Sequence, residues 1–198
     1  MSPPLQLLGI TGSLRRASFN TALLRVVSRT LPPDVEFALR DLHGVPPYDG
    51  DVEAQGMPES VVALREAIRG ADGVIVSSPE YNRGVPGVLK NAVDWSSRGK
   101  DQPWRGKPLL LMSASDGGFG GARARIAWLP TFAVLGARQM HSPEVYLSFA
   151  QNAFAADGSL LEARTQAQLE RTLAAFVEFT RTSPRLAAGP GGRPAVQA

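Results

Sequence analysis

Short apolar segments alternate along this chain with segments whose apolar residues have helical spacing, and this alternation constrains the fold more than any other feature. The apolar segments, which we predict to be strands, lie at 5–10, 35–39, 73–78, 108–114 and 138–141. Strands that alternate with helices pair in parallel through right-handed crossovers. Nearly uninterrupted apolar runs are typical of strands that helices cover on both faces.

The segments between these strands predict helices at 18–29, 58–70, 86–97, 121–135 and 159–180. Ser18 or Asn20 is the expected N-cap of the first helix, and Pro130 predicts a kink or break in the fourth. Five strands and five helices in this order favour a flavodoxin-like, doubly wound fold. We therefore predict an α/β three-layer sandwich with a five-stranded parallel sheet of order 2-1-3-4-5 and helices on both faces.

The 198 residues suit one domain, because domains typically contain about 100–200 residues. We predict that residues 1–182 form this domain. Residues 40–57 contain several prolines and glycines and are expected to form a long loop. Residues 183–198 are rich in proline and glycine and are predicted to be a disordered tail.

The composition excludes several kinds of chemistry. The chain has no cysteine and two histidines, His43 and His141. Disulfides, a thiol nucleophile, cysteine-bound zinc and cysteine-held iron–sulfur clusters are therefore excluded, and a histidine-rich metal site is not possible. We expect no bound metal. The absence of cysteine agrees with a reducing compartment.

The charged residues do not indicate binding to nucleic acid or to a membrane. The net charge is +3, and 18 of the 21 basic residues are arginines that are spread along the chain. A nucleic-acid-binding surface would concentrate them with interleaved aromatic residues. The start of the chain lacks a basic segment followed by a long apolar one, and no apolar run is long enough to span a membrane. We expect a cytoplasmic protein.

The loop after the first predicted strand has the composition of a phosphate site. It brings hydroxyls, an amide and a guanidinium to the start of a helix, from Ser13, Arg15, Ser18, Asn20 and Thr21. Helix N-terminal amides and the helix dipole favour an anion there. The loop is neither a Walker A motif nor a Gly-x-Gly-x-x-Gly fingerprint, so a monophosphate is the better prediction.

The loops after the third and fourth predicted strands are expected to lie at the same edge of the sheet, where ligands of such folds bind. In the segment 79–95, prolines and glycines shape a backbone whose amides can bond the edge of a flat heterocycle, and Tyr81 can pack on it. Glu80 is a second candidate contact, although it is equally consistent with a surface carboxylate. The segment 115–121 contains four glycines, which permit close approach of a ligand.

These motifs resemble the NADPH-dependent FMN reductase family, whose members include quinone, chromate and azo-dye reductases. The resemblance rests on Gly12-Ser13-x-Arg15-x-x-Ser18-x-Asn20, on Pro79-Glu80-Tyr81-Asn82 and on Val85-Pro86-Gly87-Val88-Leu89-Lys90-Asn91-Ala92-Val93-Asp94-Trp95. It covers roughly residues 5–180 and extends through the glycine-rich segment to Gly121-Ala122-Arg123.

The resemblance implies a cofactor, FMN, and a site for it. The residues that it assigns to the FMN phosphate are Ser13, Arg15, Ser18, Asn20 and Thr21. Those that it places along the isoalloxazine are Pro79, Glu80, Tyr81, Asn82 and Gly84, with Ser115, Gly117 and Gly118 on the other side. Hydride would pass from NADPH (or NADH) to FMN and then to a quinone, chromate, an azo compound or free flavin. The cofactor performs this chemistry, so we name no catalytic side chain.

The resemblance also implies a homodimer or homotetramer. The helix 86–97 with Trp95 is our candidate partner face, although its apolar residues could equally belong to the core. Three alternatives stay open. A non-enzymatic electron carrier of flavodoxin type is disfavoured by the basic composition, because such carriers usually present an acidic surface. An FMN-binding redox sensor is the second. A nucleotide-binding enzyme without flavin is the weakest, because the first loop matches neither standard nucleotide motif.

Overall fold

The computed structural model describes residues 3–184 and contains one five-stranded parallel sheet. The strands are β1 (Leu5–Thr11), β2 (Val35–Arg40), β3 (Gly73–Ser77), β4 (Pro108–Ala114) and β5 (Arg138–Leu147). Their order is β2-β1-β3-β4-β5, and each neighbouring pair is parallel. The predicted sheet and strand order are confirmed. Residues 185–198, most of the predicted tail, lie outside the described residues.

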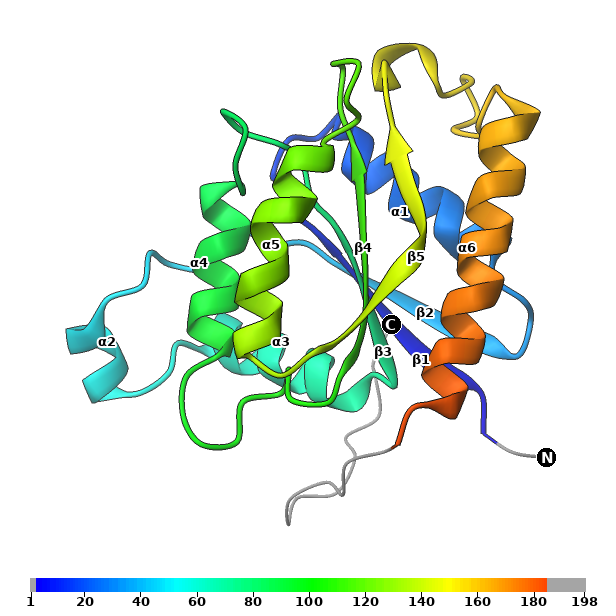
Figure 1. The fold of residues 1–198 in the computed structure, drawn as a ribbon. Helices are drawn as coiled ribbons and strands as arrows, with labels where there is room; N and C mark the ends of the chain where they lie inside the picture. Colours follow the sequence, from blue (N-terminus) through cyan, green and yellow to red (C-terminus); the bar gives the residue numbers. More distant parts are fainter. Residues whose placement is uncertain (1–2, 185–198) are drawn as a thin grey trace.

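Helices cover both faces of the sheet (Figure 1). The α-helices of the described residues are α1 (Phe19–Thr30), α2 (Gly50–Gln55), α3 (Glu59–Gly70), α4 (Gly87–Ser96), α5 (Ala122–Val134) and α6 (Ala163–Thr182), of which α2 projects away from the sheet (Figure 1). Helices α1 and α6 pack on one face, and α3, α4 and α5 pack on the other. The predicted three-layer architecture is therefore confirmed.

The alternation of side chains along each strand divides the core into two parts. Leu5 and Leu7 of β1 join the part beneath α1 and α6, whereas Leu8 and Ile10 join the part beneath α3, α4 and α5. Every residue of β3 is buried. Each large aliphatic side chain buried in this way contributes about 1.5–3 kcal/mol to stability. The carboxyl ends of the strands, from which the loops start, therefore belong to a well-packed sheet.

Three features differ from the sequence predictions by more than two residues. The segment 40–57 contains the short helix α2, which has no buried residue and therefore no apolar periodicity to reveal it. Strand β5 continues to Leu147 instead of ending near 141, and it includes Pro143, which an edge strand tolerates. Helix α6 begins at Ala163 instead of 159.

Two further sequence predictions concern single residues. Trp95 is completely buried, and its Nε1 donates to the carbonyl oxygen of Pro46 at 2.9 Å. Trp95 therefore belongs to the core, while the remainder of this helix as a partner face stays a prediction. Pro130 does not break its helix, because α5 continues on both sides of it.

Candidate functional site

Three loops meet at the carboxyl edge of the sheet, as the parallel topology requires. The amide of Gly12, after β1, donates to the carbonyl oxygen of Ser77 at 2.9 Å, and the amide of Ser78, after β3, donates to Met112 of β4 at 2.9 Å. A Cβ atom on Gly12 would lie only 2.9 Å from the Cδ of Pro79. The loops after β1 and β3 are therefore packed against each other, and the loop after β3 starts beside the end of β4.

The loop after β1 ends in a side-chain cap on α1. Ser18 is the N-cap residue, and its Oγ accepts from the amide of Thr21 at 3.2 Å. Ser13 is also buried, and its Oγ accepts from the amide of Arg15 at 3.4 Å. Of the two N-cap candidates in the sequence, the structure selects Ser18.

This loop fits a phosphate group. The first turn of α1 contains no acidic residue, and none occurs between residues 11 and 22. The amides of Phe19 and Asn20, in this first turn, have no acceptor within their own helix, as at any helix N-terminus. The Arg15 guanidinium is exposed and lies 4.9 Å from the centroid of the Phe19 ring. Amides, hydroxyls and one guanidinium without a carboxylate form the donor set that a phosphate dianion requires.

The side chain of Asn20, unlike its backbone amide, is already bonded to the protein and is not free to bind a phosphate. Its side chain is buried, with 3% of its surface exposed. Its Oδ1 accepts from the amide of Ala114 at 3.0 Å and from the Oγ of Ser77 at 2.9 Å, and its Nδ2 donates to the Ala114 carbonyl oxygen at 2.9 Å. The amide group therefore joins α1 to the ends of β3 and β4.

Thr21 lies directly beside Asn20 and pairs with a residue that the sequence analysis did not select. Its Oγ1 is 2.9 Å from the Oγ1 of Thr11, the last residue of β1. The Thr11 hydroxyl also accepts from the amide of Ser13 at 3.4 Å. Thr11 and Thr21 thus support the loop from below. A polar residue at the end of an apolar run was the available signal for Thr11.

The loop after β3 forms a tight hairpin. The amide of Tyr81 donates to Gly84 at 3.1 Å, and the amide of Gly84 donates back to Tyr81 at 2.9 Å. Asn82 and Arg83 occupy the turn with φ values of 50° and 65°, a conformation that non-glycine residues rarely adopt. The hairpin holds Tyr81 exposed to solvent, where its ring is available to a flat ligand.

Glu80 is directed towards α5 rather than into open space. Its Oε2 accepts from the amide of Arg123 at 3.0 Å, and its Oε1 lies 3.5 Å from the Arg123 guanidinium. A carboxylate at a helix N-terminus is favourable because it interacts with the helix dipole. Glu80 therefore connects the hairpin to α5, and both of its carboxylate oxygens already have a partner in Arg123.

The glycine-rich loop after β4 is held by its own backbone and by the end of β5. The Oγ of Ser115 accepts from the amide of Gly117 at 3.2 Å, and the carbonyl oxygen of Gly118 accepts from the Oγ of Ser148 at 2.9 Å. At its far end Gly121 has a φ of 86°, and a Cβ there would lie 2.8 Å from the Cβ of Ser113. Only glycine fits that position.

Open space remains where a flat ring would approach. A Cβ on Gly84 would meet nothing nearer than 3.7 Å, the same is true on Gly117, and a Cβ on Gly87 would meet nothing within 4 Å. These three glycines lie in the hairpin, in the glycine-rich loop and at the start of α4. The loops therefore expose backbone that can contact a heterocycle, and this arrangement fits FMN with its phosphate at α1.

The carboxyl end of β5 contributes residues that the sequence analysis did not identify. Tyr146 lies against the glycine-rich loop, since a Cβ on Gly120 would come within 3.0 Å of it. Burial raises the pKa of the Tyr146 hydroxyl to about 12, against an opposing effect of Arg125. Phe149 follows with a left-handed backbone. No motif in the sequence marks these positions.

Two observations limit the chemistry of the described residues. Within the range 3–184, no three His, Cys, Asp or Glu side chains are grouped as a metal site would require. No helix in the same range has the length and apolar character needed to cross a membrane.

Comparison with known proteins agrees with this geometry. The family model described as NADPH-dependent FMN reductase matches residues 5–152. An NAD(P)H-dependent FMN reductase of Pseudomonas aeruginosa is 42% identical over 181 residues, which cover 91% of this chain and 98% of that protein. A quinone reductase of Escherichia coli is 42% identical over 182 residues, covering 90% of this chain and 97% of that protein.

A solved structure is also similar. The flavoenzyme FerB of Paracoccus denitrificans, an NAD(P)H:(acceptor) oxidoreductase, superposes with a TM-score of 0.82 at 35% identity, covering 90% of this chain and 98% of that one. Fold and site together define a flavodoxin-like flavoprotein. The chain belongs to the NADPH-dependent FMN reductase family, and the predictions of an oxidoreductase, of FMN as cofactor and of NAD(P)H as co-substrate are confirmed at that level.

Proposed function

We propose that this protein transfers reducing equivalents from NADPH or NADH to a small acceptor through FMN bound at the carboxyl edge of its sheet. When bound, FMN supplies the hydride-accepting ring. The observation that carries the proposal has two parts, both at the carboxyl edge of the sheet. The N-terminus of α1 has no acidic residue, and the glycines Gly84, Gly87 and Gly117 have open space around their Cα atoms. A quinone is the first acceptor to test, because a 42% identical relative is a quinone reductase. Chromate, azo compounds and free flavin are further candidates. A cytoplasmic location stays a prediction from the sequence.

The residues have separate roles in this proposal. Ser13, Arg15, Ser18 and Thr21, with the first amides of α1, would hold the phosphate. Tyr81, Asn82 and the backbone of Pro79 and Gly84 would contact one side of the ring system, with Ser115, Gly117 and Gly118 on the other. Asn20 and Glu80 would act by holding these loops in place, because their side chains already bond to Ala114 and Arg123.

Replacing Arg15 by alanine tests the phosphate site. Hydrogen bonds to charged groups contribute about 1.5–3 kcal/mol, so we expect the dissociation constant of FMN to rise by roughly 10- to 150-fold. Flavin fluorescence titration of the apoprotein measures it. Arg16→Ala is the matched control, because Arg16 is exposed and adjacent. Equal FMN affinity in the parent and in Arg15→Ala would show that the phosphate lies elsewhere.

Arg83 and Arg123 are the candidates for recognising the additional phosphate of NADPH. Arg123 is engaged by Glu80 and lies 3.9 Å from the Phe119 ring centroid, whereas Arg83 is exposed at the tip of the hairpin. We expect Arg83→Ala to reduce the ratio of kcat/KM for NADPH over NADH by about tenfold, the loss of one charge-assisted contact. Arg123→Ala should change kcat/KM for both coenzymes by the same factor. An unchanged ratio in Arg83→Ala would refute this assignment.

A homodimer is the proposed assembly, and the outer face of α5 is its candidate interface. Ile126 and Val134 are 64% and 83% exposed, and Ala127, Pro130 and Ala133 are exposed beside them. From Ile126 to Val134 the helix contains no charged residue, and a helix segment that is apolar on all sides is normally buried on all sides. The five exposed residues are uncharged, so they can pack on the same residues of a second copy across a two-fold axis.

Light scattering coupled to size exclusion tests the interface. We expect twice the chain mass at micromolar concentration, and we expect the double variant Ile126→Glu, Val134→Glu to elute as a monomer because the charges would be buried. Val62→Glu on α3, also at an exposed apolar residue, is the control and should stay dimeric. A monomeric parent protein would overturn the homodimer.

A further inference from the structure

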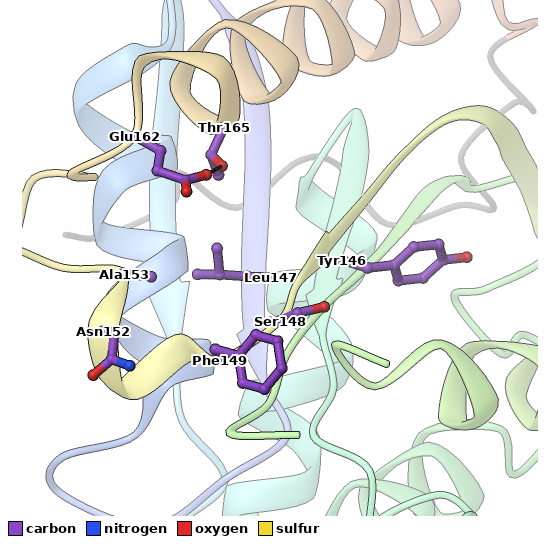
Figure 2. Close-up of a pocket in the computed structure, with 8 residues that line it drawn as sticks. All are labelled: Tyr146, Leu147, Ser148, Phe149, Asn152, Ala153, Glu162 and Thr165. Carbon is purple, nitrogen blue, oxygen red and sulfur yellow. Dashed lines mark hydrogen bonds between the residues drawn. The ribbon is translucent and has the colours of Figure 1, made fainter. Parts of the chain in front are cut away.

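A cavity of about 330 Å³ lies beside the proposed flavin site, between the end of β5 and the start of α6. Its lining is Tyr146, Leu147, Ser148, Phe149, Asn152, Ala153, Glu162 and Thr165 (Figure 2). None of these residues belongs to the three loops of the flavin site. In Figure 2 the Tyr146 ring points away from the other seven side chains, so the remaining seven define the space.

This cavity shares a wall with the glycine-rich loop. The amide of Ser115 donates to Leu147 at 3.0 Å, the amide of Ala150 donates to Ser115 at 2.9 Å, and the amide of Phe149 donates to Gly117 at 3.3 Å. The segment that lines the cavity is thus bonded to the loop proposed to contact the isoalloxazine. A ligand in the cavity would lie on the β5 side of that loop.

Phe149 is the most unusual residue of the lining. It has φ 48° and ψ 43°, a left-handed conformation that is an outlier for a bulky residue. Its side chain is 57% exposed, so the conformation is not compensated by burial of the ring. The ring covers Gly118, where a Cβ would lie 3.3 Å from the Phe149 Cζ. Strained residues of this kind cluster at ligand sites, and this one lines the cavity.

The lining of the cavity carries one negative charge and no positive charge. Glu162 is the one charged residue among the eight, and no lysine, arginine or histidine lines the space. Its Oε2 accepts from the Thr165 Oγ1 at 3.0 Å, which leaves Oε1 as a free acceptor within the described structure. The exposed Asn152 amide provides both a donor and an acceptor. A carboxylate with no cation among the lining residues disfavours phosphate, sulfonate and other anions in this space.

We propose that this cavity is a second ring-binding site, separate from the flavin site, for an uncharged aromatic molecule that carries hydroxyl groups. The ring would stack on Phe149, and the hydroxyls would donate to Glu162 and bond to Asn152. Aromatic stacking and a few placed polar groups are the usual means of recognition in small-molecule sites. Hydroquinones, the products of quinone reduction, are uncharged aromatic molecules of this kind. Only this choice of ligand rests on the proposed function.

Binding of a stable probe to the FMN-loaded protein tests the proposal without turnover. The probe is 2,6-dihydroxynaphthalene, measured by ligand-observed NMR and calorimetry, and the anionic comparison is naphthalene-2,6-disulfonate. We expect Phe149→Asn to raise the dissociation constant of the dihydroxy probe at least tenfold. Asparagine tolerates the left-handed conformation but removes the ring. Leu161→Asn, at an exposed apolar residue outside the lining, is the control and should bind as the parent does.

Glu162→Gln tests the charge at constant shape. This variant should bind the dihydroxy probe more weakly than the parent does, and it should bind the disulfonate. Equal probe affinity in Phe149→Asn and the parent, or preference of the parent for the disulfonate, would overturn the proposal. FMN content is read separately from the flavin absorbance. Loss of probe binding in Phe149→Asn with full FMN supports the site, whereas a protein that binds the probe but no FMN would refute the proposed function alone.

Discussion

Replacement of Asn20 by alanine is expected to destabilise the protein by about 3 kcal/mol, because three hydrogen bonds of a buried amide are lost at about 1 kcal/mol each. The partners left behind are the backbone of Ala114 and the hydroxyl of Ser77. The same variant should bind FMN at least tenfold more weakly, since the start of α1 and the loop after β4 lose their common attachment. Urea unfolding and flavin titration measure the two effects.

Asn91→Ala provides a matched control. The Asn91 side chain also bonds the backbone twice, accepting from the amide of Tyr48 at 2.7 Å and donating to Pro46 at 2.8 Å, but it fixes another loop. We expect it to lower stability with little change in FMN affinity. If Asn20→Ala behaved in the same way as Asn91→Ala, Asn20 would contribute to stability alone and not to the cofactor site.

Gly121→Ala is expected to have the second large effect, a loss of about 2–5 kcal/mol in stability. A left-handed alanine costs about 1–2 kcal/mol, and overpacking against Ser113 adds about 1–3 kcal/mol. Because Gly121 is the N-cap of α5 and ends the glycine-rich loop, the displacement should also weaken FMN binding. Thermal unfolding and flavin titration of the variant measure these effects.

Gly136→Ala separates the two causes. Gly136 also has a positive φ, 72°, but its added Cβ would meet nothing closer than 3.7 Å. This variant should lose only the conformational part of the stability and should bind FMN as the parent does. Equal losses of stability in the two variants would show that the contact with Ser113 is relieved at no cost.

The sheet could be predicted from the sequence because each strand is a local signal. The apolar runs and the helical spacing between them are visible within windows of ten to fifteen residues, and parallel connectivity follows from their alternation. The end of β5 was missed for the opposite reason. Its last residues are defined by pairing with β4, as in Met112 with Val145 and Ala114 with Leu147, and this pairing has no local signature.

The composition of the site could be predicted, but the roles of individual side chains could not. Asn20 lies in a loop that has every feature of a phosphate site, yet its amide bonds to residues 57 and 94 positions away in the chain. Glu80 is likewise directed to Arg123, 43 positions away. Such contacts depend on the register of the sheet and the placement of α5, which a single sequence does not reveal. Phe149 had no signal at all, because its importance lies in its backbone conformation.

Anaerobic reduction of the purified protein by NADPH is the most direct test of the central claim. We expect flavin absorbance at about 450 nm that is lost on adding NADPH without air, because FMN, when bound, would supply the hydride-accepting ring. Subsequent addition of a quinone should restore it. A colourless protein that takes up no added FMN and does not oxidise NADPH would contradict the account and would leave a phosphate- or nucleotide-binding protein with this fold.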